Sequence, residues 1–322
     1  MAIALTAFRR PRADLLRQWL PVLTLAILVA VVGTLQPGFL APATLLQLAS
    51  DTATLFVLAT GVSFVIMLGG IDLGIQSMAS LASVIVALTL PRIGYAAFPL
   101  AVLAGCLAGC LAGLAHVRLK IPSFIATLAV GGVFAGTALV ISKERSITLG
   151  EAERAYVTWI TGNTAGIPHE VLIGLVVLFL AHLVQSRTRF GRYSAAIGAG
   201  EAAAYASGVK VDRQKVIAFT VSSALAALAG VILAGRLASG SPTLANELLL
   251  PAIAAVVVGG TAITGGVGSV WRTLTGALII SVIRIGMTFV GVNIFAQQIV
   301  FGAVLVLAVA ITIDRSKIPV VK

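Results

Sequence analysis

The chain has 322 residues, of which 59% are hydrophobic and only 10% charged, and its mean hydropathy is +1.09. Soluble domains of this length do not have such a composition, so we exclude a soluble enzyme and predict an integral membrane protein. We attribute the net charge of +11 to basic loops that lie against anionic membrane lipid, rather than to a nucleic-acid partner.

Apolar segments long enough to cross a membrane recur along the whole chain. A crossing takes about 20 mainly apolar residues, because helical backbone satisfies its own hydrogen bonds in lipid. About ten such segments predict an all-α polytopic fold, with residues 1–322 forming a single transmembrane domain. The expected spans are Leu20–Gln36, Thr52–Gly69, Ile75–Leu90, Tyr95–Ala115, Ile121–Ser142, Pro168–Ser186, Lys215–Arg236, Leu250–Thr264, Val270–Phe289 and Ala296–Ile313.

Helix-breaking residues and the distribution of basic residues add detail to this predicted fold. Pro251 and the glycine pairs Gly69-Gly70 and Gly259-Gly260 interrupt the apolar pattern, so broken helices are expected there. Lys and Arg collect in cytoplasmic loops, and most of the 22 basic residues fall on one side when ten spans are drawn. This distribution predicts cytoplasmic termini and a cytoplasmic loop over residues 187–214.

Motifs for catalysis and metal binding are absent from the sequence. There is no phosphate loop ending in Gly-Lys-Ser/Thr, no His-Glu-x-x-His and no Gly-x-Ser-x-Gly elbow, so neither ATP hydrolysis nor another enzymatic activity is expected of this chain, and no catalytic residue or metal site is assigned. Cys106 and Cys110 alternate with Gly105, Gly109 and Gly113 at helical spacing. That small-residue face predicts close helix packing rather than a disulfide.

The loop at 187–214 carries the most informative pattern. Gly200 can begin a short helix, Glu201 complements the positive end of its dipole, and Gly208 suits a left-handed ending. Alanines and Tyr205 between them form a mildly apolar knob among basic residues, which suits insertion into a protein cleft. A plain loop packed on its own subunit fits the same spacing.

The order of several segments resembles the ribose-type branch of ABC importer permeases. Phe190-Gly191-Arg192-Tyr193 is followed at the expected spacing by Ala202-Ala203 and Ser207-Gly208-Val209. Further matching segments are Gly70-Ile71-Asp72-Leu73, Lys120 to Leu128 and Ala252 to Trp271. The resemblance therefore covers nearly the whole chain.

This resemblance implies a permease subunit that moves a monosaccharide from a periplasmic binding protein to the cytoplasm by alternating access, in the bacterial inner membrane. The implied partners are that sugar-binding protein, a like or related second permease, and cytoplasmic ABC ATPase subunits. The chain itself would bind no cofactor, since ATP and Mg would be held by the ATPases. The residues implied to contact the ATPase, as a coupling helix, are Gly200, Glu201, Ala202, Ala203, Tyr205, Ser207 and Gly208.

Two departures from the family pattern stand out. Gly208 follows Ala203 by five positions, where the general importer motif has four, and Arg284 stands where related sugar permeases often carry amides. A branched-chain amino-acid ABC permease and a stand-alone secondary transporter are the alternative interpretations. The context of Asp72 and Pro122 favours a sugar permease.

Polar and aromatic residues within apolar spans are candidates for the substrate pathway, because amides and hydroxyls can replace water around a sugar. The candidates are Phe124, Thr127, Asn293, Gln297 and Gln298. Helix packing explains each of them equally well.

Overall fold

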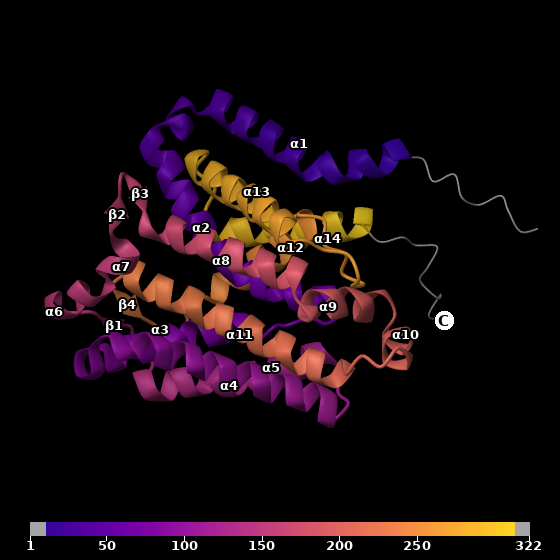
Figure 1. The fold of residues 1–322 in the computed structure, drawn as a ribbon. Coiled ribbons are helices and arrows are strands. Elements are labelled where there is room, and N and C mark those ends of the chain that lie inside the picture. The colour runs from indigo at the N-terminus through magenta and orange to yellow at the C-terminus, as the bar shows by residue number, and fades with distance from the viewer. Residues whose placement is uncertain (1–10, 313–322) are drawn as a thin grey trace, which may run out of the picture.

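The computed structural model describes the backbone of residues 11–312, so the expected positions of the two termini lie outside the described residues. Within residues 11–312, ten long helices form the body of the bundle (Figure 1). They are α1 (Pro11–Leu35), α2 (Pro42–Met67), α3 (Ile75–Ile93), α4 (Ala97–Arg118), α5 (Ser123–Ser142), α8 (His169–Arg187), α11 (Val211–Arg236), α12 (Leu249–Val258), α13 (Val270–Phe289) and α14 (Ile294–Thr312).

Short elements connect these helices. The longer connections contain α6 (Glu151–Arg154), α7 (Thr158–Thr161), α9 (Arg189–Ala199), α10 (Glu201–Ala206), and the 3-10 turns η1 (Pro37–Leu40), η2 (Gly94–Ala96), η3 (Ala155–Val157) and η4 (Asn246–Leu248). Strand β1 (Ile147–Thr148) pairs antiparallel with β4 (Ser239–Gly240), and β2 (Asn163–Thr164) pairs with β3 (Ile167–Pro168). The expected all-α class is confirmed.

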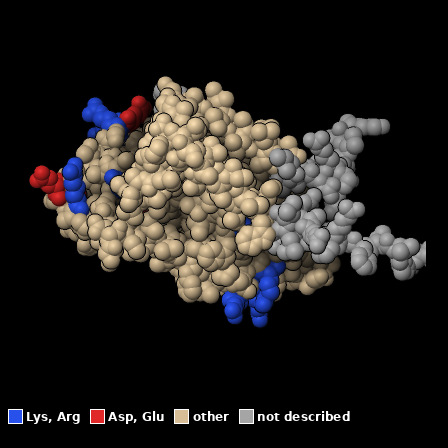
Figure 2. All heavy atoms as spheres, turned by 90° about the horizontal axis from the view of Figure 1, so that it is seen from above, with Lys and Arg blue, Asp and Glu red and all other residues tan. Residues whose placement is uncertain are grey.

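Six helical stretches of the described chain are long and apolar enough to cross a membrane, one of them the 44-residue stretch that includes both α3 and α4. Shorter apolar stretches cover Trp19–Leu35, Asn246–Val258 and Ala296–Ala310. Each expected span overlaps one of the ten helices, while the number of membrane crossings remains a prediction. Over its middle, the face drawn in Figure 2 carries few charged side chains, as a lipid-facing belt requires.

Two expected boundaries are wrong. Helix α2 begins at Pro42 rather than Thr52, because Pro is pre-organised for a first helical turn and Asp51 is compensated by an ion pair with Arg236. Helix α12 ends at Val258 rather than Thr264, because Gly260 turns the chain with a φ of +93°.

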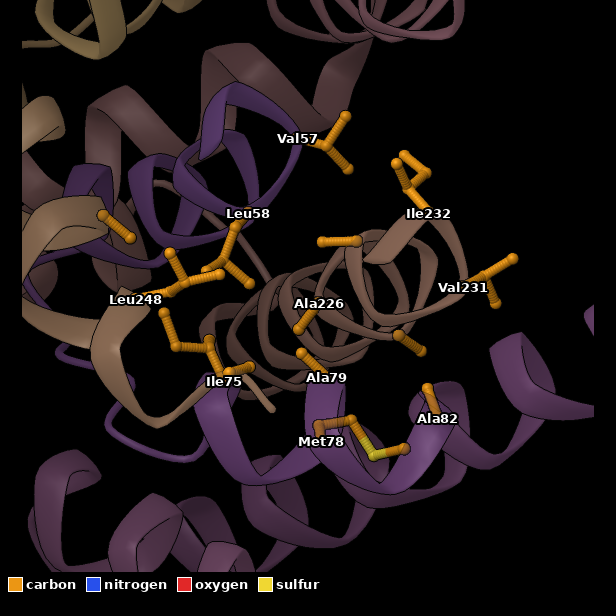
Figure 3. Close-up of a cluster of buried hydrophobic side chains, with 14 of the residues drawn as sticks. Val57, Leu58, Ile75, Met78, Ala79, Ala82, Ala226, Val231, Ile232 and Leu248 are labelled. Atoms are coloured by element: carbon orange, nitrogen blue, oxygen red, sulfur yellow. The ribbon is translucent and has the colours of Figure 1, made fainter. Parts of the chain in front are cut away.

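Helix α2 lies at the centre of the bundle. From Thr52 to Met67 every residue is buried, and α8, α11, α12 and α13 surround it. Figure 3 shows Val57 and Leu58 of α2, Met78 and Ala79 of α3, and other side chains from α11 and η4 in one cluster. Lipid is as apolar as these side chains, so close packing rather than transfer from water holds them together.

The small-residue face of α4 packs against α11 within the same chain. A methyl group placed at Gly109 would lie 2.2 Å from the Phe219 carbonyl oxygen, and one at Gly105 would lie 2.6 Å from that of Ser223. Only glycine leaves room for backbones this close. The face expected from the sequence is thus an intramolecular contact.

Replacing Gly109 with alanine should lower the free energy of unfolding by about 1–3 kcal/mol, since the methyl group forces α4 and α11 apart. Thermal unfolding of the detergent-solubilised protein measures this change. Gly132→Ala on α5 is the matched control, because nothing lies within 4 Å of a methyl group there. Equal melting temperatures for the two variants would contradict this packing.

Candidate functional site

Helices α9 and α10 project from one end of the bundle, between α8 and α11 (Figure 1). The sequence predicted α10 but not α9 as a separate helix. Extended backbone at Thr188 separates α8 from α9, and Gly208 ends the α10 turn with a φ of +81°. The left-handed ending expected at Gly208 is therefore present.

Helix α10 is anchored on one side and exposed on the other. Ala204 is buried in a cluster with Val65, Leu68 and Phe219, which belong to the ends of α2 and α11. Tyr205 has 74% of its surface exposed. The other residues implied to contact the ATPase, Gly200, Glu201, Ala202, Ala203, Ser207 and Gly208, are exposed apart from the half-buried Gly200. Helix α10 therefore exposes a small surface of alanines and one aromatic ring.

An ion pair fixes α10 to the transmembrane body. Lys215 Nζ on α11 lies 2.7 Å from Glu201 Oε1 and 2.8 Å from Oε2. The lysine side chain is only 16% exposed, whereas that of Glu201 is 56% exposed. Lys215 therefore holds α10 against α11, while the Glu201 side chain stays partly exposed.

Helix α9 is tied to the same support. The Gln214 amide donates hydrogen bonds to the Phe190 carbonyl oxygen at 2.9 Å and to Ser194 Oγ at 3.1 Å. A methyl group at Gly198 would lie 2.0 Å from the Met67 carbonyl oxygen, so α9 packs directly on the end of α2. Helices α9, α10 and α11 thus form one connected unit.

A glycine loop, residues 259–269, reaches this unit from the other half of the bundle. Gly266 N–H donates to the Met67 carbonyl oxygen at 2.9 Å. Gln185 at the end of α8 binds the backbone where the loop enters α13, donating to the Gly268 carbonyl at 3.0 Å and accepting from Val270 N–H at 3.0 Å. The loop is an interhelical turn, at the glycine pair where a broken helix was expected.

The break between α2 and α3 is also held by side chains. Asp72 is buried, and its carboxylate accepts hydrogen bonds from Ser222 Oγ at 2.8 Å and Gly74 N–H at 2.9 Å. Ile71 N–H donates to Ser123 Oγ at 3.0 Å. Asp72 thus holds the backbone directly before α3, since Gly74 immediately precedes that helix.

The five substrate-pathway candidates do not gather in one place. Thr127 is buried and accepts a hydrogen bond from Leu73 N–H at 3.0 Å, which is a structural role, and Phe124 is 46% exposed on the outer face of α5. Gln297 is buried at a separate cavity and donates to Thr288 Oγ1 at 3.2 Å. Gln298 binds Glu247, and Asn293 immediately precedes α14.

Sequence reasoning missed the residues that support α10. Lys215 and Gln185 looked like ordinary span ends, and their partners are 14 and 85 residues away along the chain. The one available signal was the pairing of opposite charges at the two ends of the 201–215 segment.

Comparison with known proteins identifies the family of this chain. Residues 44–309 match the family described as "Branched-chain amino acid transport system / permease component". The chain belongs to this family. It is 39% identical to the ribose import permease protein of Bacillus subtilis (strain 168), over 92% of each chain.

Further relatives agree with this assignment. The identity is 36% to the ribose import permease protein of Haemophilus influenzae, covering 89% of this chain and 90% of that one. It is 30% to the D-allose transport system permease protein of Escherichia coli (strain K12), covering 89% of each chain. The resemblance to ribose-type ABC importer permeases expected from the sequence is confirmed.

Replacing Gln185 with leucine should lower the free energy of unfolding by about 1–3 kcal/mol, because Val270 N–H and the Gly268 carbonyl would lose their half-buried partner. Thermal unfolding in detergent measures the change. The same substitution at Gln36, whose side chain makes no hydrogen bond to any described residue, serves as the control. A melting temperature for Gln185→Leu equal to that of the control would contradict this bridging role.

Proposed function

We propose that this chain is the membrane-spanning permease subunit of an ATP-driven importer for a monosaccharide. The observation that carries the proposal is the similarity, along nearly the whole chain, to permeases named for ribose and D-allose. The family description mentions branched-chain amino acids, but these relatives are named for sugars. The amino-acid alternative is therefore not favoured.

In the proposed importer, α10 docks into a cleft of a cytoplasmic ABC ATPase, and residues 187–214 form the loop that presents it. The chain itself performs no catalysis. The ATPase subunits supply the energy by binding and hydrolysing ATP with Mg. The exposed knob around Tyr205 is the part of this chain that meets them.

Movement at α10 has a defined route into the membrane. A displacement of α10 is transmitted to α11 by the ion pair between Glu201 and Lys215. Helix α9 transmits a displacement to α2 through its contact with Met67, and the glycine loop, which is bonded to Met67, transmits it to α13. Packed elements of this kind shift as rigid bodies rather than deforming smoothly. Tilting of these helices would close the sugar path on one side of the membrane and open it on the other.

With α10 on the cytoplasmic side, the orientation of the chain and the positions of its other partners follow. We propose ten crossings of the bacterial inner membrane, with both termini on the cytoplasmic side with α10. The opposite end, with β1 to β4 and α6, would meet the periplasmic sugar-binding protein (Figure 1). A second permease, like or related, would complete the pathway across the membrane.

Affinity purification from the native membrane tests this function. We expect an ABC ATPase to accompany the chain, and the reconstituted complex to take up D-ribose or a related monosaccharide only when ATP and the binding protein are present. Uptake without any ATPase, driven by an ion gradient, would instead identify a secondary transporter.

Replacing Glu201 with arginine should lower sugar uptake at least about tenfold, because the new side chain repels Lys215 and tilts α10. A loss of about 1.4 kcal/mol in docking free energy suffices for a tenfold change. The charge-exchanged variant, Glu201→Lys with Lys215→Glu, should recover part of the uptake. Amounts of inserted protein are compared by immunoblot, and unchanged uptake in Glu201→Arg would refute the coupling role of this pair.

Replacing Gly208 with proline should abolish coupled uptake. Proline cannot adopt the φ of +81° found there and removes the N–H that donates to the Tyr205 carbonyl oxygen at 2.9 Å. Gly208→Ala keeps the N–H and loses only about 1 kcal/mol to the left-handed conformation, so its uptake should remain measurable. ATP hydrolysis and uptake are measured together, and equal uptake in the two variants would count against the proposal.

A further inference from the structure

A cavity of about 490 Å³ lies between α2, α13 and α14. Its size falls within the range of about 300–1,000 Å³ that is usual for small-molecule sites. Polar side chains on three helices face it although they lie within or beside apolar spans. Among the lining residues are Gln47, Asp51, Arg284, Thr288, Phe289 and Gln297.

The cavity is at the far side of the membrane from α10. Asp51 pairs with Arg236, the last residue of α11, whereas Glu201 of α10 pairs with Lys215 near the start of the same helix. At a rise of about 1.5 Å per residue, these two positions on α11 are about 30 Å apart. With α10 in the cytoplasm, the cavity faces the side on which the binding protein delivers its ligand.

Charges around the cavity are balanced but not fully paired. Besides the pair with Asp51, Arg236 Nε lies 3.9 Å from Glu170 Oε1, so two carboxylates share one guanidinium. Arg284 supplies the second positive charge, which makes the four charges neutral in sum. The Arg284 side chain forms no hydrogen bond or ion pair with any described residue.

An arginine in a membrane helix is costly unless it has a partner or a function. Arg284 offers a planar set of N–H donors, Gln47 and Gln297 offer both donors and acceptors, and Asp51 is an acceptor. Phe289 supplies an apolar wall. This mixture suits a ligand that carries many hydroxyl groups and one apolar face, and the balanced charge disfavours an anion.

We propose that this cavity is the permease's own binding site for a neutral monosaccharide on its way across the membrane. The proposal rests on the sugar-import function given above. Arg284 and Gln297 bind sugar hydroxyls, and the ring of Phe289 packs against the C–H face of the sugar. Of the pathway candidates in the sequence, only Gln297 lines this site, and Arg284 is its central donor.

Uptake of D-ribose by the reconstituted complex of permease, ATPase and binding protein tests the site. Arg284→Met and Gln297→Leu should each lower the maximal rate about ten- to hundredfold, the effect of losing a hydrogen bond to a charged or buried group. The concentration of loaded binding protein at half-maximal rate should stay the same, because docking occurs outside the cavity. Arg284→Lys, which keeps the charge but loses the planar donors, should recover uptake only in part.

A matched pair on α13 separates binding from folding. Thr288 lines the cavity, whereas Thr275 lies about three and a half turns away on the same helix and does not line it, and each hydroxyl donates to the carbonyl oxygen four residues earlier. Thr288→Val should therefore slow uptake, while Thr275→Val should not. Melting temperatures and ATPase association show whether each variant is intact.

Thiol protection gives a readout that needs no turnover. In a chain with both native cysteines replaced by alanine, Thr288→Cys should react with a methanethiosulfonate reagent more slowly when D-ribose is present. Uptake by Arg284→Met within twofold of the parent, no protection at position 288, or preference of the parent for D-ribonate over D-ribose would each overturn the proposed site. Absence of all ATP-dependent uptake in the parent complex would instead overturn the importer function itself.

Discussion

Every break in a membrane helix frees backbone N–H and C=O groups that lipid cannot satisfy, and this constraint organises the protein. The breaks after α2 and α12 lie next to each other, where Gly266 N–H donates to the Met67 carbonyl oxygen. Side chains from α5 and α8 bind three further N–H groups there, through Ser123, Thr127 and Gln185. Because α9 packs on the same junction, satisfying the backbone also builds the support for α10.

The two ends of α11 support two different parts of the protein. Lys215 near its start holds the exposed helix α10, and Arg236 at its end holds Asp51 beside the polar cavity. A single rigid helix thus connects the proposed ATPase contact with the proposed sugar site. In the proposed importer, tilting α11 would move both ends at once and so couple ATP hydrolysis to access.

Sequence reasoning was strongest where one residue type has one physical use. Apolar length identified the helices, and Gly200 and Gly208 bracketed α10, with Gly208 in the left-handed turn that favours glycine. The glycine face of α4 was also recognised, although periodicity reveals a face and not its neighbour. Only the structure shows that the neighbour is α11.

The parts that were missed depend on contacts between distant segments. Thr127 was a pathway candidate because it is polar in an apolar span, yet its hydroxyl holds the backbone of Leu73. The cavity brings together Asp51 and Arg284, which are more than 200 positions apart in the chain. Spacing along one helix cannot predict such a meeting, since it depends on how whole helices pack.

Site-specific photocrosslinking at position 205 tests the central claim most directly. A photoreactive phenylalanine analogue replaces Tyr205 in the native membrane, and the same group at Tyr95, which is 59% exposed at the opposite end of the bundle, serves as the control. We expect a covalent adduct with an ABC ATPase at position 205 and none at position 95. Adducts at position 205 that contain only lipid or the permease itself would contradict the docking of α10.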